Sequence, residues 1–597
     1  MEINSQTIRE TDLDKFANGT STNLWEVLGA QVIGGNTRFS VWAPNAVEVT
    51  VNDHSLHPTK YGVWETTIPE DLTGLHYSYN LKLVNGETLV KFDPMSLSNE
   101  VHPNRKSIIY KSNYTWNDSE WISNRRNFSL IDSPVTVYEV HVHSWKSGKT
   151  YRDLATELVA YVKDLGFTHV QLMPVADYPF IPSWGYQITG FYAPSAYYGE
   201  PDDLRFFIDS CHQSGIGVIL DWVGYHFARD DFGLAKYDGT SLYSMPEDAP
   251  EQVNNLWGTD IFDFSKPEVQ SFLVSNVIYW AKEFHIDGFR IDAVAPMINK
   301  NARDIHNEKP EKIPDWDGVR IIRSINDLIH SFFPGVFTIG EETQGWPTLT
   351  SPTTHLPMGM GFDLKFFHDA SWGWGVHFLP YERIDTRFTY EHLMELMTRV
   401  FEEKHIWLIS HDEVFHGCKG SMQKHMVMWR TSEFAAKLLP TYLMFMLSAP
   451  GKALFFMGSE LNSEKLWEPL SELDWSPEAF VRSPEILRNA MKAHKATPEL
   501  YRNDFSPSGL TMVIADKPKD KVVAFLRSFN NEETLCVYNF SIESHPQYEI
   551  PGMQGVLLKE IANSTTEPFI ETSFGILDLP EGSARWFKVY RHQVLPV

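Results

Sequence analysis

The sequence predicts an α/β protein, a closed (β/α)8 TIM barrel flanked by an N-terminal β-sandwich and a C-terminal antiparallel β domain. Two observations predict this architecture. From residue 135 onward, short apolar runs rich in β-branched residues alternate with longer helix-like segments. Shorter strand patterns, in which apolar and polar residues alternate, precede and follow that region. A chain of 597 residues also exceeds one ordinary domain, so several are expected.

The two flanking domains are predicted from alternating strands separated by turn residues. Near the N-terminus these strands include Thr37–Trp42 and Val47–Val51, and near the C-terminus Val522–Arg527 and Thr534–Asn539. Alternation of this kind is typical of antiparallel strands with one face buried. We therefore expect four segments, an extension, a β-sandwich, a catalytic barrel and a C-terminal β domain, at residues 1–22, 23–125, 126–498 and 499–597.

The barrel is predicted from eight near-continuous apolar runs, as expected for parallel strands that helices cover on the outside. These runs lie at residues 135–140, 169–173, 218–222, 288–292, 336–340, 361–365, 406–409 and 453–456. Helices are predicted between several of them, including Asp202–Ser214, Pro267–Glu283 and Ser432–Met446. The connection Val223–Ser265 is too long for a turn, and such loops at a barrel's carboxyl rim usually shape a substrate cleft.

The composition disfavours several classes of partner. Lys and Arg total 51 against 77 Asp and Glu, a formal net charge of −26, so we expect neither nucleic acid nor a membrane as partner. The three cysteines, Cys211, Cys418 and Cys536, lack disulfide or zinc spacing, and no signal peptide is apparent, which predicts a cytoplasmic location. The most apolar stretch, Leu438–Met457, is interrupted by prolines and predicts a buried helix followed by a strand.

Charged side chains that end or follow the predicted barrel strands are the candidates for a catalytic site, because strand ends line the mouth of such barrels. They are Asp221, His226, Arg290, Asp292, Glu341, Glu342, His411 and Asp412. Each has a structural explanation of its own, such as an ion pair, a satisfied core histidine or a helix cap. Their convergence at one end of the strands favours catalysis, since retaining glycoside hydrolysis requires two carboxyl groups about 5 Å apart.

These segments resemble the sequence signatures of the alpha-amylase superfamily. The four matching stretches are Asp221–His226, Gly288–Val294, Ile339–Glu342 and Ile409–Asp412. Within that superfamily, further stretches are more similar to the glycogen (1,4-alpha-glucan) branching enzymes than to plain amylases. They are Ser183–Pro194, Tyr138–Val142, Ser410–Val414 and Pro450–Gly458.

The resemblance implies cleavage of an α-1,4 glucan by a retaining double displacement and transfer of the chain to a 6-hydroxyl. It implies that Asp292 is the nucleophile, Glu341 the acid/base and Asp412 the transition-state stabiliser. Glu341 is preferred over Glu342 because the family's acid/base directly follows a small residue, here Gly340. It further implies substrate-binding roles for Tyr192, which would stack beneath the reacting glucose, and for Asp221, His226, Arg290 and His411.

The implied partner is an α-glucan polysaccharide such as glycogen or amylose, with no metal or organic cofactor, because the histidines lack ligand spacing. Three segments depart from branching enzymes. Pro296–Lys300 replaces a tyrosine-rich segment, and the loop His416–Ser421 has an extra residue at Cys418. Val51–Leu56 replaces the usual turn of the carbohydrate-binding module that the N-terminal domain resembles. An α-glucan hydrolase, a 4-alpha-glucanotransferase and a catalytically weak glucan-binding protein therefore stay open as alternatives. The three carboxylates argue against the last.

Overall fold

The computed structural model describes residues 7–249, 253–254, 257–303, 311–366, 390–417, 431–517, 519–565 and 567–591. Eight strands form a closed barrel in the order β11-β12-β15-β19-β20-β21-β22-β23, which confirms the predicted (β/α)8 fold. Their bounds are β11 Thr136–Val140, β12 His169–Leu172, β15 Gly217–Val223, β19 Gly288–Asp292, β20 Phe337–Glu341, β21 Leu364–Phe366, β22 His405–Ile409 and β23 Lys452–Phe456. Almost every one of these residues is buried, as expected for strands covered on both faces.

The predicted helices are also present, as α6 (Pro201–Gln213), α7 (Pro267–Glu283) and α13 (Ser432–Ser448). Both α6 and α7 begin with proline, whose fixed φ suits the first helical turn. The sixth strand, β21, begins at Leu364, later than predicted, and Gly361, with a φ of +83°, lies outside it. Among the residues that the structure describes, no helix has the length and apolarity needed to cross a bilayer.

The chain divides into two compact units, here called the first and the second unit. The first comprises residues 1–126, 148–158 and 172–362, and the second 127–147, 159–171 and 363–597. Strands β15, β19 and β20 belong to the first unit, and β11, β21, β22 and β23 to the second. The segment boundaries predicted from the sequence stay predictions.

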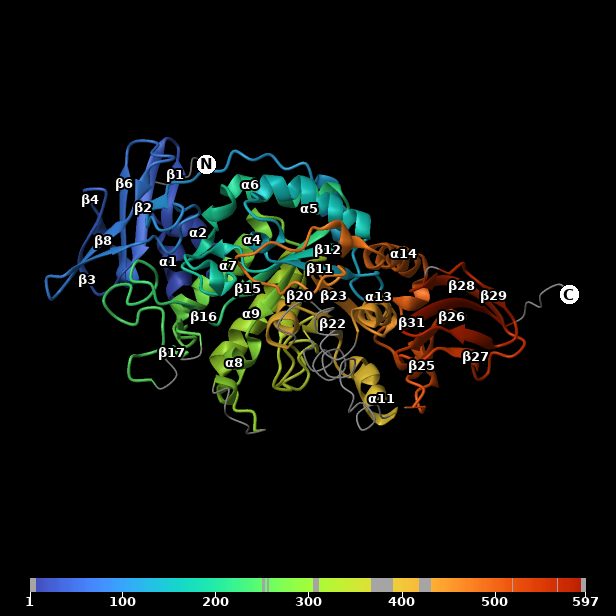
Figure 1. Cartoon of the computed structure of the whole chain (residues 1–597). Helices are drawn as coiled ribbons and strands as arrows, with labels where there is room; N and C mark the ends of the chain where they lie inside the picture. Colours follow the sequence, from blue (N-terminus) through green and yellow to red (C-terminus); the bar gives the residue numbers. More distant parts are fainter. Residues whose placement is uncertain are drawn as a thin grey trace. The chain divides into compact units, whose positions relative to one another are not determined.

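The first unit contains the predicted sandwich, built from two antiparallel sheets (Figure 1). One sheet has the order β1-β2-β6-β5, with bounds Gly29–Ile33, Asn36–Trp42, Val63–Ile68 and His57–Pro58. The other has the order β4-β3-β8-β9, with bounds His54–Ser55, Ala46–Val51, Tyr79–Leu83 and Thr88–Lys91. Phe39, Val49 and Leu81 are buried in it. Burial alternates along β8, as the sequence pattern predicts, whereas β2 is buried on both faces.

The sandwich packs on the long connection that follows β15. Lys91 is buried and its Nζ donates to the carbonyls of Asp231 and Ala235 at 2.5 and 2.7 Å. The Trp42 and Tyr243 rings meet edge to face with centroids 5.4 Å apart. The connection itself forms a small sheet from β16 (His226–Ala228), β18 (Thr259–Ile261) and β17 (Val253–Asn254). Strands of two or three residues are too short to show alternation, so the sequence pattern did not predict them.

Helix α1 (Glu10–Ala17) lies within the segment predicted as an extension. It packs against α7, where the Ser271 hydroxyl donates to the Phe16 carbonyl at 2.9 Å. The Phe16 ring also meets Trp42 of the sandwich edge to face, with centroids 5.5 Å apart. This segment is therefore part of the packed structure of the first unit.

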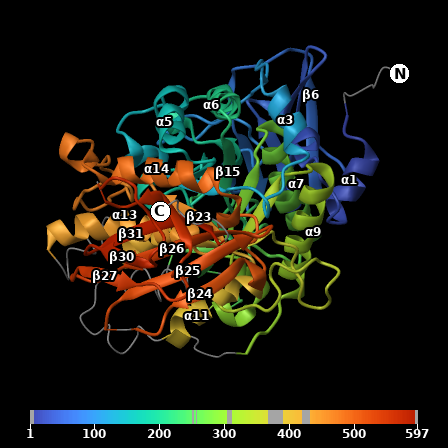
Figure 2. The same cartoon turned by 90° about the vertical axis from the view of Figure 1, so that its right-hand side faces the viewer.

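The second unit contains the predicted C-terminal β domain (Figure 2). Its main antiparallel sheet has the order β24-β25-β26-β31-β28-β29, with bounds Leu510–Ile514, Val522–Phe529, Glu532–Asn539, Ser583–Tyr590, Leu557–Asn563 and Glu571–Thr572. A second sheet pairs β27 (His545–Glu549) with β30 (Ile576–Leu579). Helices α13 and α14 (Ser483–Ala496) pack on β31 and β28 respectively. The domain is thus attached to the outer helices of the barrel.

A buried histidine connects two aspartates at the amino end of β19 in the first unit. His212 Nδ1 lies 2.8 Å from Asp118 Oδ2, and its Nε2 lies 2.8 Å from Asp287 Oδ2. Arg125 donates to the other oxygen of Asp287 at 2.9 Å. Burial alone would lower the pKa of His212, but the charge of Asp287 and hydrogen bonds to both aspartates outweigh it and raise the pKa to about 9. The imidazolium form is therefore the one that this cluster stabilises.

We expect this cluster to make the folded chain less stable as the pH becomes alkaline. The pKa of His212 rises from about 6.5 in the unfolded chain to about 9 in the folded chain. Its contribution to the free energy of unfolding is therefore fully present below pH 6.5. That contribution, on the order of 3 kcal/mol, is lost as the pH rises through the folded pKa. The urea midpoint should fall more between pH 6.5 and 9.5 in the parent than in His212→Gln. Equal falls in both proteins would contradict this assignment.

Candidate active site

Three of the sequence-predicted side chains contact the guanidinium of a fourth, Arg290, in the first unit, and a fifth, His226, lies beside one of them. Arg290 Nη1 donates to Asp221 Oδ1 at 2.8 Å and to Asp292 Oδ1 at 2.5 Å. Its Nη2 lies 3.0 Å from Glu341 Oε2. His226 Nε2 lies 4.0 Å from Asp292 Oδ2. One buried arginine thus brings the two carboxylates Asp292 and Glu341 to the same place.

The strand register explains this convergence. Strands β15, β19 and β20 are parallel neighbours, and Asp221 pairs in register with Arg290, which in turn pairs with Ile339. Period-two alternation places Arg290 and Asp292 on one face of β19. Glu341 ends β20, two residues beyond Ile339, on the same face as Arg290's side chain. Short-range sequence pattern and parallel pairing together therefore determine the cluster.

The backbone beside the two carboxylates is also adapted to them. Ala293 has a φ of +50°, a left-handed conformation that costs energy for a residue with a Cβ, and its N–H donates to Glu341 Oε2 at 2.7 Å. A Cβ added to Gly340 would lie 3.0 Å from the Phe362 ring. Only glycine therefore fits without displacement directly before Glu341.

The electrostatic environment favours one retained proton in the carboxylate pair. Burial raises the pKa of Asp292 above its ordinary range, the Arg290 charge opposes this, and the negative charges of Glu341 and Asp221 add to the rise. Two such carboxyls titrate as a pair and do not both ionise readily. Burial lowers the pKa of His226 to about 3, so its imidazole is neutral at physiological pH. Of the neighbours that act on Asp292, Arg290 is the one that favours the ionised form, which a nucleophile requires.

The neighbouring glutamates Glu341 and Glu342 have different surroundings. Glu342 is buried, and its two oxygens accept hydrogen bonds from the backbone N–H groups of Gln344 and Trp346 at 2.8 and 2.7 Å. It therefore fixes the loop that follows β20. The Glu341 side chain is 17% exposed and contacts Arg290. Of the two, Glu341 has the surroundings of a group that can reach a ligand.

Tyr192 requires a correction, because its ring is not available to stack on a sugar. It lies in β14 (Gly190–Pro194), has no exposed surface, and donates its hydroxyl hydrogen bond to the Phe272 carbonyl at 2.7 Å. Its ring packs against those of Phe272 and Tyr279, with centroids 5.4 and 5.3 Å apart. It is a core aromatic between β14 and α7.

Two other aromatic residues border the Arg290 cluster and were missed by the sequence reasoning. The Tyr186 hydroxyl donates to Asp221 Oδ2 at 2.6 Å, and Arg290 Cζ lies 5.9 Å from its ring centroid. Trp257 is 37% exposed, and its ring centroid lies 5.0 Å from that of His226. Tyr186 lies in the same motif, Ser183–Pro194, as Tyr192, so the motif was informative although the residue chosen from it was not.

His411 and Asp412 form a group in the second unit, at the carboxyl end of β22. His411 Nδ1 lies 2.9 Å from Glu139 Oε1, and its backbone N–H donates to Glu139 Oε2 at 2.8 Å. Gln171 donates to Glu139 Oε1 at 3.1 Å. His411 Nε2 lies 3.7 Å from Asp412 Oδ2, and the Asp412 side chain is 25% exposed. Glu139, a buried glutamate of β11, therefore fixes the orientation of His411.

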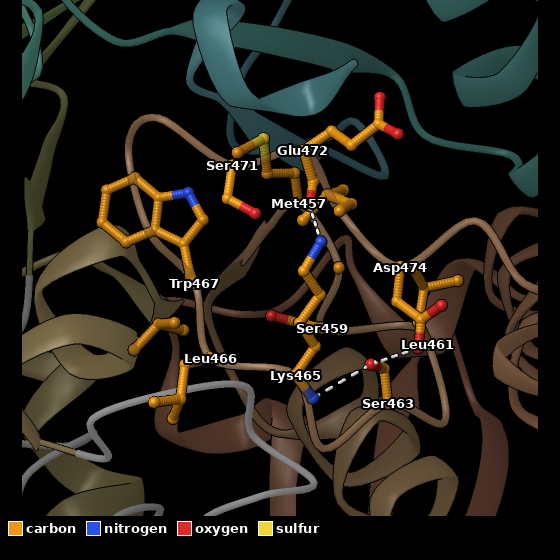
Figure 3. Close-up of a pocket in the computed structure, with 13 residues that line it drawn as sticks. Met457, Ser459, Leu461, Ser463, Lys465, Leu466, Trp467, Ser471, Glu472 and Asp474 are labelled. Carbon is orange, nitrogen blue, oxygen red and sulfur yellow. Dashed lines mark hydrogen bonds between the residues drawn. The ribbon is translucent and has the colours of Figure 1, made fainter. Parts of the chain in front are cut away.

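The loop after β23 is closely packed (Figure 3). The Lys465 backbone N–H donates to Ser463 Oγ at 3.1 Å, and its Nζ donates to the Glu472 carbonyl. Trp467 donates to Ser144 Oγ at 2.9 Å. The cavity between these residues measures about 30 Å³, which holds a water molecule but no sugar ring. The loop is therefore held by contacts among its own residues and with Ser144.

Two protein families match this chain. The alpha amylase catalytic domain matches residues 151–238 and 257–507, which include most of the barrel. Carbohydrate-binding module 48, the isoamylase N-terminal domain, matches residues 27–96 in the sandwich. The Arg290 cluster lies entirely within the first match.

Curated relatives extend over nearly the whole chain. The 1,4-alpha-glucan branching enzyme of Corynebacterium jeikeium is 37% identical and covers 96% of this chain and 85% of its own. That of Kitasatospora aureofaciens is 39% identical and covers 94% of this chain and 76% of its own. A pullulanase from Anoxybacillus, solved with maltotetraose, has a TM-score of 0.73 at 17% identity, covering 94% of this chain and 87% of its own. At 17% identity, the similarity to the pullulanase shows a shared fold only.

Proposed function

Because this chain belongs to the alpha-amylase family, we propose that it acts as a 1,4-alpha-glucan branching enzyme. It cleaves an α-1,4 bond and transfers the released chain to a 6-hydroxyl of a glucan, with retention at the anomeric carbon, as glycogen biosynthesis requires. The observation that carries the proposal is the placement of Asp292 and Glu341 on the single guanidinium of Arg290. Branching enzymes 37% and 39% identical over almost the whole chain support the same reaction.

The first half of the reaction uses the pair on Arg290. Asp292 attacks the anomeric carbon and forms a covalent ester while Glu341 gives its proton to the departing 4-oxygen. In the second half, Glu341 takes the proton of the incoming 6-hydroxyl, whose oxygen displaces Asp292. Two inversions give net retention. Arg290 stabilises the ionised form of Asp292 when it attacks.

The remaining site residues act on the sugar. Asp412 stabilises the positive charge that develops on the ring, and its partly exposed side chain suits that role. His226, neutral because it is buried, and His411 bind sugar hydroxyls. We assign the role expected of Tyr192 to Tyr186, which contacts both Asp221 and Arg290. Asp221 then orients Arg290 and Tyr186 together.

The proposed partner is an α-glucan such as glycogen or amylose, and the proposed location is the cytoplasm. The test is to incubate the purified chain with amylose and follow iodine staining, reducing ends and α-1,6 linkages in the product. Branching predicts loss of stain with new α-1,6 linkages and little rise in reducing ends. A rise in reducing ends that matches the loss of stain would identify a hydrolase, and no change in either would favour a glucan-binding protein.

We expect Glu139→Gln to lower turnover although Glu139 is itself fully buried. The glutamine amide would place its N–H groups against an N–H donor of His411 or Gln171. It would also remove the carboxylate that orients the His411 imidazole. Changes in the partners of metal-bound histidines cost about 10- to 100-fold elsewhere, and we expect a loss of that order in kcat. The measurement is kcat and its pH profile, which should shift because His411 loses a carboxylate partner.

Glu460→Gln is the matched control for this change. Glu460 is another buried glutamate of the second unit, and its Oε1 accepts from the hydroxyls of Tyr138 and Tyr161 at 2.8 and 2.6 Å. Glutamine can accept both of those bonds, so kcat should stay near the parent value. If Glu139→Gln and Glu460→Gln have the same kcat and pH profile, Glu139 has only a structural role.

A further inference from the structure

We propose that Trp257 determines the length of donor that the enzyme accepts, because its ring binds the second glucose unit of the donor chain, next to the unit that Asp292 attacks. Trp257 lies between β17 and β18 in the long connection after β15, which the sequence predicts to shape a substrate cleft. The choice of a glucan as ligand rests on the proposed function, but the role of Trp257 can be tested apart from branching.

A row of contacts leads from the proposed acid/base to Trp257. Arg290 contacts Glu341 through Nη2 at 3.0 Å and Asp292 Oδ1 through Nη1 at 2.5 Å. The other oxygen of Asp292 lies 4.0 Å from His226 Nε2. The centroid of the His226 ring in turn lies 5.0 Å from that of Trp257. Trp257 therefore lies at the end of this row that is opposite to Glu341.

This order of contacts assigns Trp257 to the donor side of the cleaved bond. The leaving oxygen must lie at Glu341, which gives it a proton, so the departing part of the substrate extends from that end of the row. The donor chain continues from the opposite side of the glucose on Asp292, because the 1- and 4-positions of a pyranose lie across the ring from each other. The second donor unit is therefore the one that reaches Trp257.

The surroundings of Trp257 leave part of its side chain accessible to a ligand. The residue is 37% exposed, although its ring contacts His226 and meets the buried ring of Tyr225 edge to face, with centroids 6.2 Å apart. Indole has a large apolar surface, so a ligand that covers it removes that surface from water and gains free energy. The C–H face of a glucose unit is such a cover, and the hydroxyls at its edge can stay in water.

Hydrogen bonds to the main chain hold Trp257 in place. Gln187 Nε2 donates to the Trp257 carbonyl at 2.9 Å, and the Trp257 N–H donates to Asn254 Oδ1 at 3.1 Å. The next residue, Gly258, donates its N–H to the Asn254 carbonyl at 2.8 Å. Gln187 directly follows Tyr186, the aromatic residue assigned to the reacting glucose. One motif therefore positions the aromatic residues for both donor units, and a site fixed in this way loses little conformational entropy on binding.

A contact at the second unit makes the enzyme select its donor by length. A donor of one glucose unit reaches Asp292 and Tyr186 but not Trp257, whereas a maltosyl donor reaches all three. The contact with Trp257 therefore raises kcat/KM for the longer donor. This difference distinguishes a binding role from a packing role, because a residue that only supports His226 would affect both donors alike.

The experiment compares fluoride release from α-maltosyl fluoride and α-glucosyl fluoride. Trp257→Ala should lower kcat/KM for maltosyl fluoride about tenfold more than kcat/KM for glucosyl fluoride, the scale expected for one lost aromatic contact. Trp257→Phe keeps a smaller aromatic ring, so the same difference should be present but smaller, at the parental melting temperature. Trp316→Ala is the matched control, because Trp316 is 52% exposed and outside the Arg290 cluster, and it should match the parent with both donors.

Equal losses with both donors in Trp257→Ala, or no loss with maltosyl fluoride, would overturn the proposal. A parent enzyme that releases fluoride from the two donors at equal rates would also overturn it, because a second unit would then contribute nothing. Branching is scored separately, by the α-1,6 linkages that the parent forms from amylose. If the parent forms none while its preference for maltosyl fluoride depends on Trp257, the branching function fails and the role of Trp257 stands.

Discussion

Asp292→Asn should abolish turnover while leaving the fold intact. Asparagine cannot form the glycosyl ester, and loss of a catalytic group that acts as part of a unit costs roughly 10⁴- to 10⁶-fold in kcat. The amide oxygen can still accept the hydrogen bond that Arg290 Nη1 donates at this position. Arg290 also keeps its contacts with Asp221 and Glu341, so the guanidinium is not left buried without a partner.

The measurement is the rate of α-1,6 linkage formation from amylose, together with the melting temperature. Asp315→Asn is the matched control, because Asp315 also accepts a hydrogen bond from a buried arginine, Arg303, at 2.5 Å. It caps α9 (Trp316–Phe332), and asparagine is an equally good cap. Asp315→Asn should keep parental kcat. An Asp292→Asn enzyme as active as the parent would remove Asp292 from the mechanism and, with it, the proposed double displacement.

The fold was largely predictable because its elements leave strong local signals. All eight barrel strands correspond to apolar runs, and α6, α7 and α13 begin within a residue of their predicted starts. A strand covered on both faces cannot tolerate polar side chains along its length, so its sequence is distinctive without any partner. The predicted sixth strand begins too early, because it includes Gly361, whose φ of +83° is not that of an extended strand.

The site was predictable only where a side chain lies on a strand end. Arg290 and Asp292 share a face by alternation, so their proximity follows from the sequence. Tyr186 and Tyr192 stand in one motif. Tyr192 lies in β14, where every residue is buried, so alternation could not show which way its ring points. Glu139 was visible as a charge within an apolar run, but its partner His411 is 272 residues away. Contacts between distant residues leave no periodic signal.

The second large effect on kcat is expected at Glu341, and it distinguishes Glu341 from its neighbour Glu342 as the acid/base. Glu341→Gln should lower kcat by about 10³-fold or more, because glutamine cannot protonate the leaving oxygen, and general acid catalysis contributes roughly 10² to 10⁴. A substrate with a good leaving group, such as a glycosyl fluoride, needs no such proton. Its cleavage by Glu341→Gln should therefore be far less impaired than that of amylose.

Glu342→Gln tests the alternative with the same chemical change one residue later. Each Glu342 oxygen accepts a backbone N–H, from Gln344 and from Trp346, and an amide nitrogen cannot accept either bond. One buried donor is then unsatisfied, which costs about 1 to 3 kcal/mol of stability. Because Glu342 holds the loop after Glu341, we expect a lower melting temperature and a modest fall in kcat that is the same for amylose and for the glycosyl fluoride. If Glu342→Gln alone lost amylose cleavage and kept the fluoride reaction, the acid/base would be Glu342, and Glu341 would need another role.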